Sequence, residues 1–203
     1  MQNTFAAVHP LPHHISRPDH NAMKSHPDYL LWSSIRLGDQ KAFELLFGKY
    51  YGALCDFSAQ LLKNRDLAEE TVADVFLTFW EKRQQITIDF SVRAYLYRAV
   101  KNRSLNKINT VYRFDDTLEE VSEDLQASFN PLDELLFNEL NIQVDNLLNV
   151  LPREEQLIFR LRLTGLTMRE ISEVLSITTK TIEYRLSKSI SFLQRQLEKY
   201  WNS

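Results

Sequence analysis

The side chains best suited to chemistry lie near the end of the chain, in the segment TKTIEYRLSKSI of residues 179–190. Four apolar residues in and just after this segment recur at helical spacing and are expected to face a core: Ile182, Leu186, Ile190 and Leu193. The opposite face then carries hydroxyl, cationic, carboxylate and phenol groups, which could hydrogen-bond the base edges and phosphates of DNA. The candidates for these contacts are Thr178, Thr179, Lys180, Thr181, Glu183, Tyr184, Arg185, Ser187 and Lys188.

The residues just before this segment predict a second, shorter helix, and the pair forms a helix-turn-helix pattern. Thr167 followed by Glu170 makes a capping box, in which hydroxyl and carboxylate satisfy unpaired amides at the start of the helix. Gly165 suits the end of the preceding helix. Ser176 stands where such turns often carry glycine, so a left-handed backbone there would be less comfortable. An ordinary helical hairpin with a solvated outer face is the alternative that this pattern leaves open.

A second segment with chemical potential, SVRAYLYRAVKNRSLNKI, covers residues 91–108 and contains five basic residues and no acidic one. Cations interleaved with aromatic and amide side chains suit phosphates and unstacked bases. A basic helix that serves only solubility is the alternative. The residues concerned are Arg93, Tyr95, Tyr97, Arg98, Lys101, Asn102, Arg103, Asn106 and Lys107.

Catalytic and metal-binding residues are scarce in the rest of the chain. All five histidines lie within residues 1–26, which argues against histidine-dependent catalysis and against most zinc sites in the folded body. The only cysteine, Cys55, lies in an amphipathic stretch and is expected to be buried. The acids at 69, 70 and 74 lack the histidines that usually complete a carboxylate metal site. We therefore expect no catalytic residue, no metal and no cofactor.

The net charge of −3 conceals a strong asymmetry along the chain. Residues 109–149 contain one basic and ten acidic residues, whereas the segments on either side are mildly basic. The composition is 44% hydrophobic with only four glycines, which is typical of folded helical proteins. No apolar run approaches the roughly 20 residues of a membrane span, and no signal peptide is recognisable, so a cytoplasmic protein is expected.

Apolar periodicity predicts an all-α fold with two small helical domains joined by an acidic linker. Helices are expected over 28–37, 39–62, 66–86, from 92 to about 108, over 132–150, over 153–163, and in the helix-turn-helix. Proline-rich residues 1–27 read as a disordered tail. The predicted divisions are 1–27 for the tail, 28–108 for the first domain, 109–130 for the linker and 131–203 for the second domain.

Four segments in order resemble the bacterial sigma factors of the extracytoplasmic-function (ECF) type. They are AFELLFGKYY (42–51), DLAEETVADVFLTFW (66–80), VRAYLYRAVKNRSLNKI (92–108) and LPREEQLIFRLRLTGLTMREISEVLSITTKTIEYRLSKSISFLQRQL (151–197). The resemblance implies that residues 28–108 form sigma domain 2, which docks on RNA polymerase and opens the minus-ten element. Residues 131–203 would form sigma domain 4, which reads the minus-thirty-five element through the helix-turn-helix.

The resemblance also assigns surfaces by position. The polymerase-binding residues would be Glu69, Glu70, Asp74, Phe76 and Trp80. The minus-ten residues would be Arg83, Gln84 and Gln85 together with the nine polar and aromatic residues of the basic segment named above. Two positions depart from the family pattern: Ala73 replaces a common glutamine of the docking helix, and Asn106 replaces a common aspartate of the basic helix.

The implied partners are core RNA polymerase, promoter DNA and an anti-sigma factor, with no small-molecule substrate and no membrane insertion. Free DNA affinity is expected to be weak without polymerase. One alternative is a helix-turn-helix regulator that binds duplex DNA as a dimer. Another is a sigma-like decoy that makes only protein interactions, which Ala73 leaves open. An enzyme is a distant third, because the body offers no recognisable nucleophile arrangement.

Overall fold

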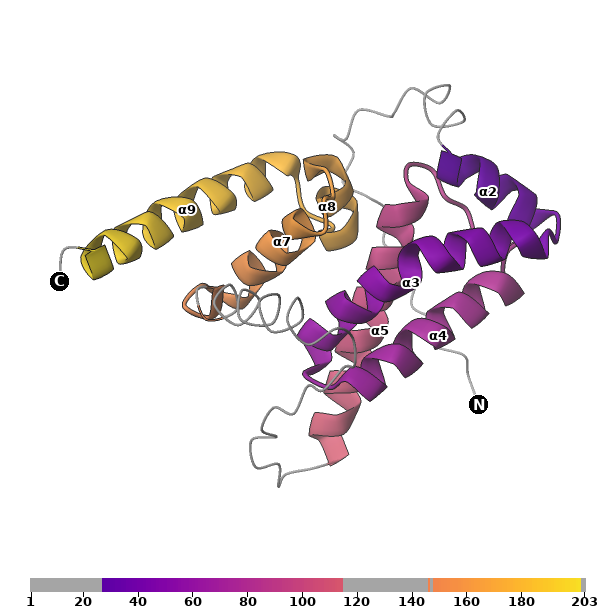
Figure 1. The fold of residues 1–203 in the computed structure, drawn as a ribbon, viewed down its shortest axis with the longest axis horizontal. Helices are drawn as coiled ribbons and strands as arrows, with labels where there is room; N and C mark the ends of the chain where they lie inside the picture. Colours follow the sequence, from indigo (N-terminus) through magenta and orange to yellow (C-terminus); the bar gives the residue numbers. More distant parts are fainter. Residues whose placement is uncertain (1–26, 115–145, 147, 202–203) are drawn as a thin grey trace, which may run out of the picture.

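The computed structural model describes residues 27–114, 146 and 148–201, and within them it contains seven helices and no strand. This confirms the predicted all-α fold. The predicted tail, most of the predicted linker and most of the helix expected before Pro152 lie outside the described residues. Figure 1 shows the helices in two groups, one that precedes residues 115–145 in the chain and one that follows them. No helix in the described part is long and apolar enough to cross a membrane.

The first group is a four-helix bundle that corresponds to the predicted first domain. It consists of α2 (Pro27–Arg36), α3 (Gln40–Leu62), α4 (Arg65–Glu81) and α5 (Val92–Phe114). The start of α2, α3 and α4 each lies within one residue of the sequence prediction. Helix α5 is longer than predicted, because 109–114 continue the helix instead of beginning the linker. These six residues contain no proline or glycine that would end a helix.

Local capping explains where the middle helices begin. The Asp39 side chain accepts a hydrogen bond from the Ala42 amide at 3.2 Å, and the Asn64 side chain accepts one from the Leu67 amide at 2.8 Å. The start of α2 is tied to α3 by Asp28, which accepts hydrogen bonds from Lys49 and from the Tyr50 hydroxyl, both at 2.5 Å. The caps set where α3 and α4 begin, and the contacts of Asp28 join the start of α2 to α3.

Aromatic rings dominate the core of this bundle. Trp32 lies 4.6 Å from Phe79 between ring centroids, and Phe76 packs edge-on against Phe47 at 4.8 Å. Cys55 is fully buried, as predicted. Near the start of α4, Leu67 is only partly buried, whereas the neighbouring Ala68 lies in the core. The small side chain there lets helices approach closely.

The second group contains the helix-turn-helix and consists of α7 (Arg153–Leu163), α8 (Met168–Leu175) and α9 (Thr179–Trp201). The predicted capping box is present, with Thr167 and Glu170 each accepting a hydrogen bond from the other's backbone amide. Gly165 has a positive φ of 81°, as its position predicted. Ser176 adopts the left-handed backbone at φ 57° despite being a non-glycine residue.

One expectation for α9 is wrong. Ile190 is 46% exposed and does not face the core, whereas Ser189 is only 1% exposed. The buried side of α9 runs through Ile182, Leu186, Ser189 and Leu193, so the stripe advances by four, three and four residues. Ser189 is satisfied there because its hydroxyl donates to the carboxylate of Glu155 on α7. A polar residue therefore occupies a core position that periodicity had given to isoleucine.

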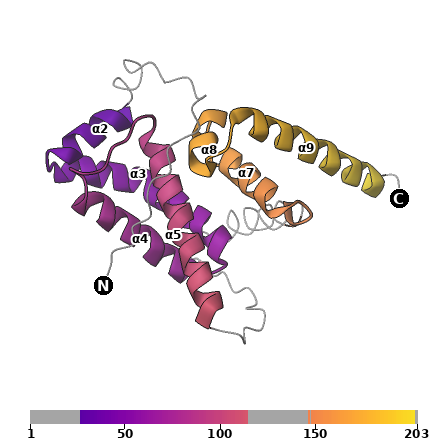
Figure 2. The ribbon, with the colours of Figure 1, turned by 180° about the vertical axis from the view of Figure 1, so that it is seen from behind.

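The two groups are in direct contact. Helix α8 packs alongside α5, which both views show (Figures 1 and 2). Apolar residues from the two groups join one continuous buried cluster, with Leu96 and Val100 of α5 in the same cluster as Ile171 and Val174 of α8. Sequence patterning predicted two separate domains with a linker, and it gave no indication of this contact.

Candidate nucleic-acid interface

The outer face of α9 presents most of the predicted DNA-contacting residues to solvent. Tyr184 is 68% exposed, and Lys180 and Lys188 lie one turn to either side of it on the same face. Thr178 caps the helix by accepting a hydrogen bond from the Thr181 amide at 3.1 Å. The residues classed as exposed are Thr178, Thr179, Lys180, Glu183, Tyr184, Ser187 and Lys188.

The remaining two predicted residues of this helix are partly buried. Thr181 hydrogen-bonds the Thr178 hydroxyl at 2.8 Å, so its hydroxyl serves the cap. Arg185 forms an ion pair with Glu154 on α7. The arginine is thereby held beside the exposed face, from which its guanidinium could turn to a phosphate only by giving up that pair.

Two cations of the basic helix α5 face the second group of helices. Arg93 forms a bidentate pair with Glu170 of α8, with Nε to Oε1 at 3.1 Å and Nη2 to Oε2 at 2.5 Å. Lys101 donates a hydrogen bond to the backbone carbonyl of Val174 at 2.8 Å. Burial lowers the pKa of the Lys101 ammonium, and the nearby charge of Arg98 adds to this effect. The face of α5 that these residues form is covered by α8.

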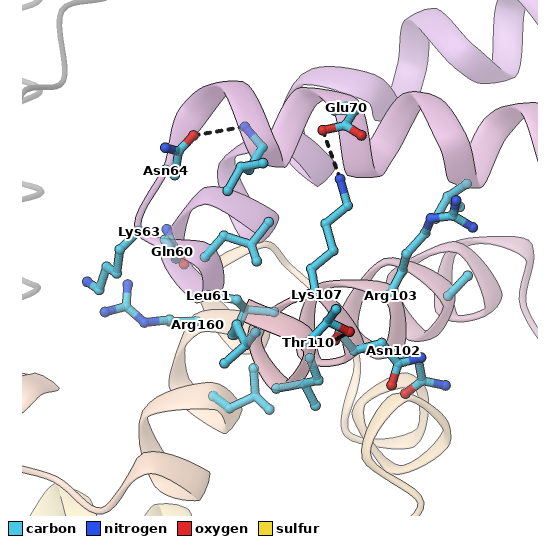
Figure 3. Close-up of a pocket in the computed structure, with 18 of the residues that line it drawn as sticks. Gln60, Leu61, Lys63, Asn64, Glu70, Asn102, Arg103, Lys107, Thr110 and Arg160 are labelled. Carbon is cyan, nitrogen blue, oxygen red and sulfur yellow. Dashed lines mark hydrogen bonds and ion pairs between the residues drawn. The ribbon is translucent and has the colours of Figure 1, made fainter. Parts of the chain in front are cut away.

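Two other cations of α5 face α4. Arg103 pairs with Asp74 at 2.6 Å. Lys107 pairs with Glu70 at 2.9 Å (Figure 3). A cation predicted to contact DNA therefore meets, in each case, an acid predicted to contact polymerase. Exposed pairs of this kind each contribute roughly 0.2–1 kcal/mol, so either partner can be released at low cost. Glu69 is paired within α4 to Arg65 at 2.9 Å.

Three of the predicted aromatic contacts lie inside the bundle. Phe76 is 1% exposed and packs in the core, so in this conformation it cannot form a docking surface. Tyr97 is 2% exposed and contacts Phe57 edge-on, with 5.2 Å between ring centroids, and burial raises the pKa of its phenol. Tyr95 is partly buried and packs against Phe79 at 5.8 Å. In this structure the aromatic rings at these positions pack within the helix bundle.

The connection between α4 and α5 has a mixed surface. The Arg83 guanidinium lies over the ring of Trp80, 4.4 Å from its centroid, and donates a hydrogen bond to the Trp80 carbonyl at 2.8 Å. Gln84 and Gln85 are exposed, as are Asn102 and Asn106 on α5, while Arg98 is partly buried. The predicted minus-ten residues therefore comprise exposed amides, two tyrosines that pack in or against the core, and a set of cations. Partners hold the cations Arg83, Arg93, Lys101, Arg103 and Lys107.

Sequence reasoning missed the contact between α5 and α8, at which four residues meet. Phe90 and Ser91 precede α5, and Arg169 and Glu170 begin α8. The Arg169 guanidinium lies 4.6 Å from the Phe90 ring centroid, and Ser91 Oγ donates to Glu170 Oε1 at 2.8 Å. Glu170 had been assigned only its capping role, and nothing local to positions 90 or 169 signals a long-range partner.

A groove of about 1350 Å³ lies between the first group of helices and α7 (Figure 3). Apolar residues line much of it, and Asn102 and Asn106 of α5 lie along it. Five of its charged residues are cations and one, Glu70, is an acid. The cations are Lys63, Arg103, Lys107, Arg153 and Arg160. The exposed amides of α5 thus lie beside several cations, of which Arg103 and Lys107 are paired with acids of α4.

Comparisons with known proteins agree with this organisation. The family model "Sigma-70 region 2" matches residues 46–113 and the model "Sigma-70, region 4" matches residues 141–193, so the two together cover more than half of the chain. The ECF RNA polymerase sigma-E factor of Haemophilus influenzae is 22% identical over 181 residues, which span 84% of this chain and 95% of the relative. The Escherichia coli protein of the same name is 23% identical and covers 84% and 94%.

Two solved structures share the fold. One is CnrH in complex with the cytosolic domain of CnrY, with a TM-score of 0.61 and 20% identity over 85% of this chain and 97% of that one. The other is the sigma factor RpoE with the anti-sigma factor NepR from Bartonella quintana, with a TM-score of 0.59 and 21% identity over 78% and 98%. With both sigma-70 regions matched in their expected order and full-length relatives of one kind, the chain belongs to the ECF-type sigma factors, which direct transcription initiation.

Proposed function

We propose that the chain grips a promoter with two surfaces and docks on polymerase with a third. The exposed face of α9 reads the minus-thirty-five element in the major groove. The connection before α5, the exposed amides of α5 and the cations of that helix hold the melted minus-ten strand. The acidic outer side of α4, with Glu69, Glu70, Asp74 and the ring of Trp80, docks on the polymerase.

The observation that carries this proposal is the solvent-exposed face of α9 in a capped helix-turn-helix. Lys180, Tyr184 and Lys188 follow one another at one-turn spacing, and the helix is anchored by the opposite, buried face. A helix presented in this way fits the major groove of B-DNA, which is about 12 Å wide.

The docking surface is supported by charge and by accessibility. Glu70 is 61% exposed at its side chain and Asp74 is 35% exposed, so their carboxylates can reach a partner. Breaking the pairs with Lys107 and Arg103 would free both kinds of charge at once. Acids would then face polymerase while cations face DNA, which couples docking to strand binding. Phe76 supports α4 from inside and takes no part in the surface.

We further propose that the protein performs no reaction of its own and acts in the cytoplasm, where polymerase and promoter are found. An anti-sigma factor is the expected regulator. Support comes from two proteins of the same fold, one solved with the cytosolic domain of CnrY and the other with the anti-sigma factor NepR.

Run-off transcription with core RNA polymerase tests the proposal. Templates carrying a set of candidate promoters are transcribed with and without the full chain, and discrete transcripts that depend on it are expected. Lys180→Ala provides the matched variant, since it changes an exposed side chain on α9 and leaves the packing alone. A well-folded protein that directs no initiation from any template would overturn the proposal.

A further inference from the structure

The start of α5 combines three groups that suit one nucleotide of single-stranded DNA. Phe90 offers an aromatic face of the kind on which bases stack. Ser91 offers a hydroxyl and Arg93 a planar guanidinium, both donors to a phosphate. Ser91 also accepts a hydrogen bond from the Ala94 amide at 3.2 Å, which places these groups at the N-terminus of a 23-residue helix, where the backbone dipole favours an anion.

The first turn of α8 occupies these three groups. A flat cation, the guanidinium of Arg169, lies over the Phe90 ring at 4.6 Å. A carboxylate, that of Glu170, takes hydrogen bonds from Ser91 Oγ at 2.8 Å and from both Nε and Nη2 of Arg93. Two consecutive residues thus place a planar group and an anion where a nucleotide would place its base and its phosphate.

We propose that Phe90, Ser91 and Arg93 form a binding site for one nucleotide of the melted strand, and that Arg169 and Glu170 of the same chain occupy it in the free protein as a nucleotide mimic. The inference deepens the proposed function and rests on it. Domain 4 and single-stranded DNA then compete for one site, so the free chain binds melted DNA weakly until α8 leaves α5.

The chemistry of the mimic matches that of the ligand. A guanidinium and a nucleobase are both planar and both stack on aromatic faces. A carboxylate and a phosphate both accept two parallel hydrogen bonds from a guanidinium. Glu170 is only 8% exposed, yet hydrogen bonds from Arg93, the Thr167 amide and Ser91 outweigh the effect of burial and lower the pKa of its carboxyl group to about 2. The carboxylate therefore remains charged in the contact, as a phosphate would.

The capping box provides a way to separate this role from folding. A glutamine at position 170 can still accept the hydrogen bond from the Thr167 amide, because capping boxes use either glutamate or glutamine. Glu170→Gln thus keeps the cap of α8 and removes the anion from Arg93. Arg169→Ala removes the planar group alone. Glu173→Gln removes the same charge from the same helix and serves as the matched control.

The test measures fluorescence anisotropy of a fluorescein-labelled, mixed-sequence, single-stranded 12-nucleotide DNA titrated with the full chain. The variant carrying both Arg169→Ala and Glu170→Gln should bind roughly tenfold tighter than wild type, because a site that is mostly occupied becomes available. Glu173→Gln should stay within about twofold of wild type, which excludes the loss of any one carboxylate from α8 as the cause. Adding Phe90→Ala or Arg93→Met to the double variant should remove the gain.

Two results would overturn the inference. One is a folded double variant, as judged by circular dichroism, that binds the oligonucleotide no more tightly than wild type. The other is a gain in affinity that persists after Phe90→Ala and Arg93→Met, which would place the DNA elsewhere. Run-off transcription with wild type in parallel tests the proposed function separately. If wild type directs transcription and either of these results is obtained, the nucleotide mimic is wrong and the proposed function stands.

Discussion

Lys180 is the side chain on which the duplex-reading role of α9 can be tested most directly. It is exposed, it lies in the first turn of the helix, and the N-terminal residues of a recognition helix are those that reach base edges. In holoenzyme, Lys180→Ala should weaken promoter binding by about 1–3 kcal/mol and reduce discrimination between promoter variants. Electrophoretic mobility shifts with a set of minus-thirty-five variants measure both effects.

Lys188 provides the comparison for that experiment, because it lies two turns further along the same face. If Lys188 meets only phosphate, Lys188→Ala should weaken all promoters alike and reduce the slope of log affinity against log salt concentration by about one unit. If the Lys180→Ala holoenzyme binds each promoter variant with the same affinity as the wild-type holoenzyme does, Lys180 reads no base.

The carboxyl group of Glu170 contributes to the free energy of unfolding, and the direction in which this contribution changes with pH follows from its pKa. Burial acts to raise its pKa, but hydrogen bonds from Arg93, the Thr167 amide and Ser91 outweigh burial and lower the pKa to about 2 from 4.5. A group whose pKa is lower in the folded state stabilises that state above its unfolded pKa and ceases to do so as the pH falls through its folded pKa. The shift corresponds to about 3 kcal/mol.

The free energy of unfolding of wild type, minus that of Glu170→Gln, should therefore be constant from about pH 5 to pH 8. Below about pH 4.5 this difference should shrink steadily with falling pH. Urea unfolding of both proteins followed by circular dichroism measures it. A difference that changed between pH 6 and pH 8 would mean that a group other than Glu170 governs the contact with Arg93.

At the scale of elements, the turn between α8 and α9 stores a small strain that one substitution should relieve. Ser176 adopts φ 57° at the end of α8, a left-handed conformation in which a side chain is unfavourable. Ser176→Gly should raise the free energy of unfolding by about 0.5–1 kcal/mol, as judged by urea denaturation. Ser191→Gly, on an exposed part of α9, should instead lower it by a few tenths of a kcal/mol.

The elements themselves could mostly be predicted from sequence, because their signals are local. The capping box at Thr167 and the break at Gly165 depend on residues within one turn, and both were found where expected. The buried face of α9 could not be predicted fully, because Ser189 is stabilised inside by Glu155, which is 34 residues away. A prediction from periodicity favours isoleucine over serine at a core position, because the pattern does not reveal a distant hydrogen-bond partner.

The candidate site shows the same division between local and long-range information. The outer face of α9 follows largely from helical spacing: seven of the nine residues predicted to contact DNA are exposed, whereas Ile190, expected in the core, is exposed as well. The interior positions of Phe76 and Tyr97 depend on how four helices pack, so residue type alone made them look like binding groups. Phe90 and Arg169 meet across 79 positions of sequence, and only the fold brings them together.

At the scale of the whole molecule, the protein cannot bind both promoter elements at once while α5 and α8 remain in contact. Elements centred about 10 and about 35 base pairs upstream are separated by roughly 85 Å of duplex at 3.4 Å per base pair. In the structure, α8 instead lies in van der Waals contact with α5. The 31 residues of segment 115–145 could reach about 100 Å if fully extended, so the chain is long enough for the two domains to separate.

The distance between the domains should therefore increase when polymerase binds. Dyes on Lys41→Cys of α3 and Ser191→Cys of α9, both exposed positions, report this distance by single-molecule energy transfer, while the native Cys55 is buried and escapes labelling. Wild type alone should give one high-transfer population, and saturating core polymerase should replace it with a low-transfer one. Arg93→Met should raise the low-transfer fraction without polymerase, because α8 loses its bidentate anchor on α5. A transfer efficiency that stays high in transcriptionally active holoenzyme would show that the domains initiate transcription without parting.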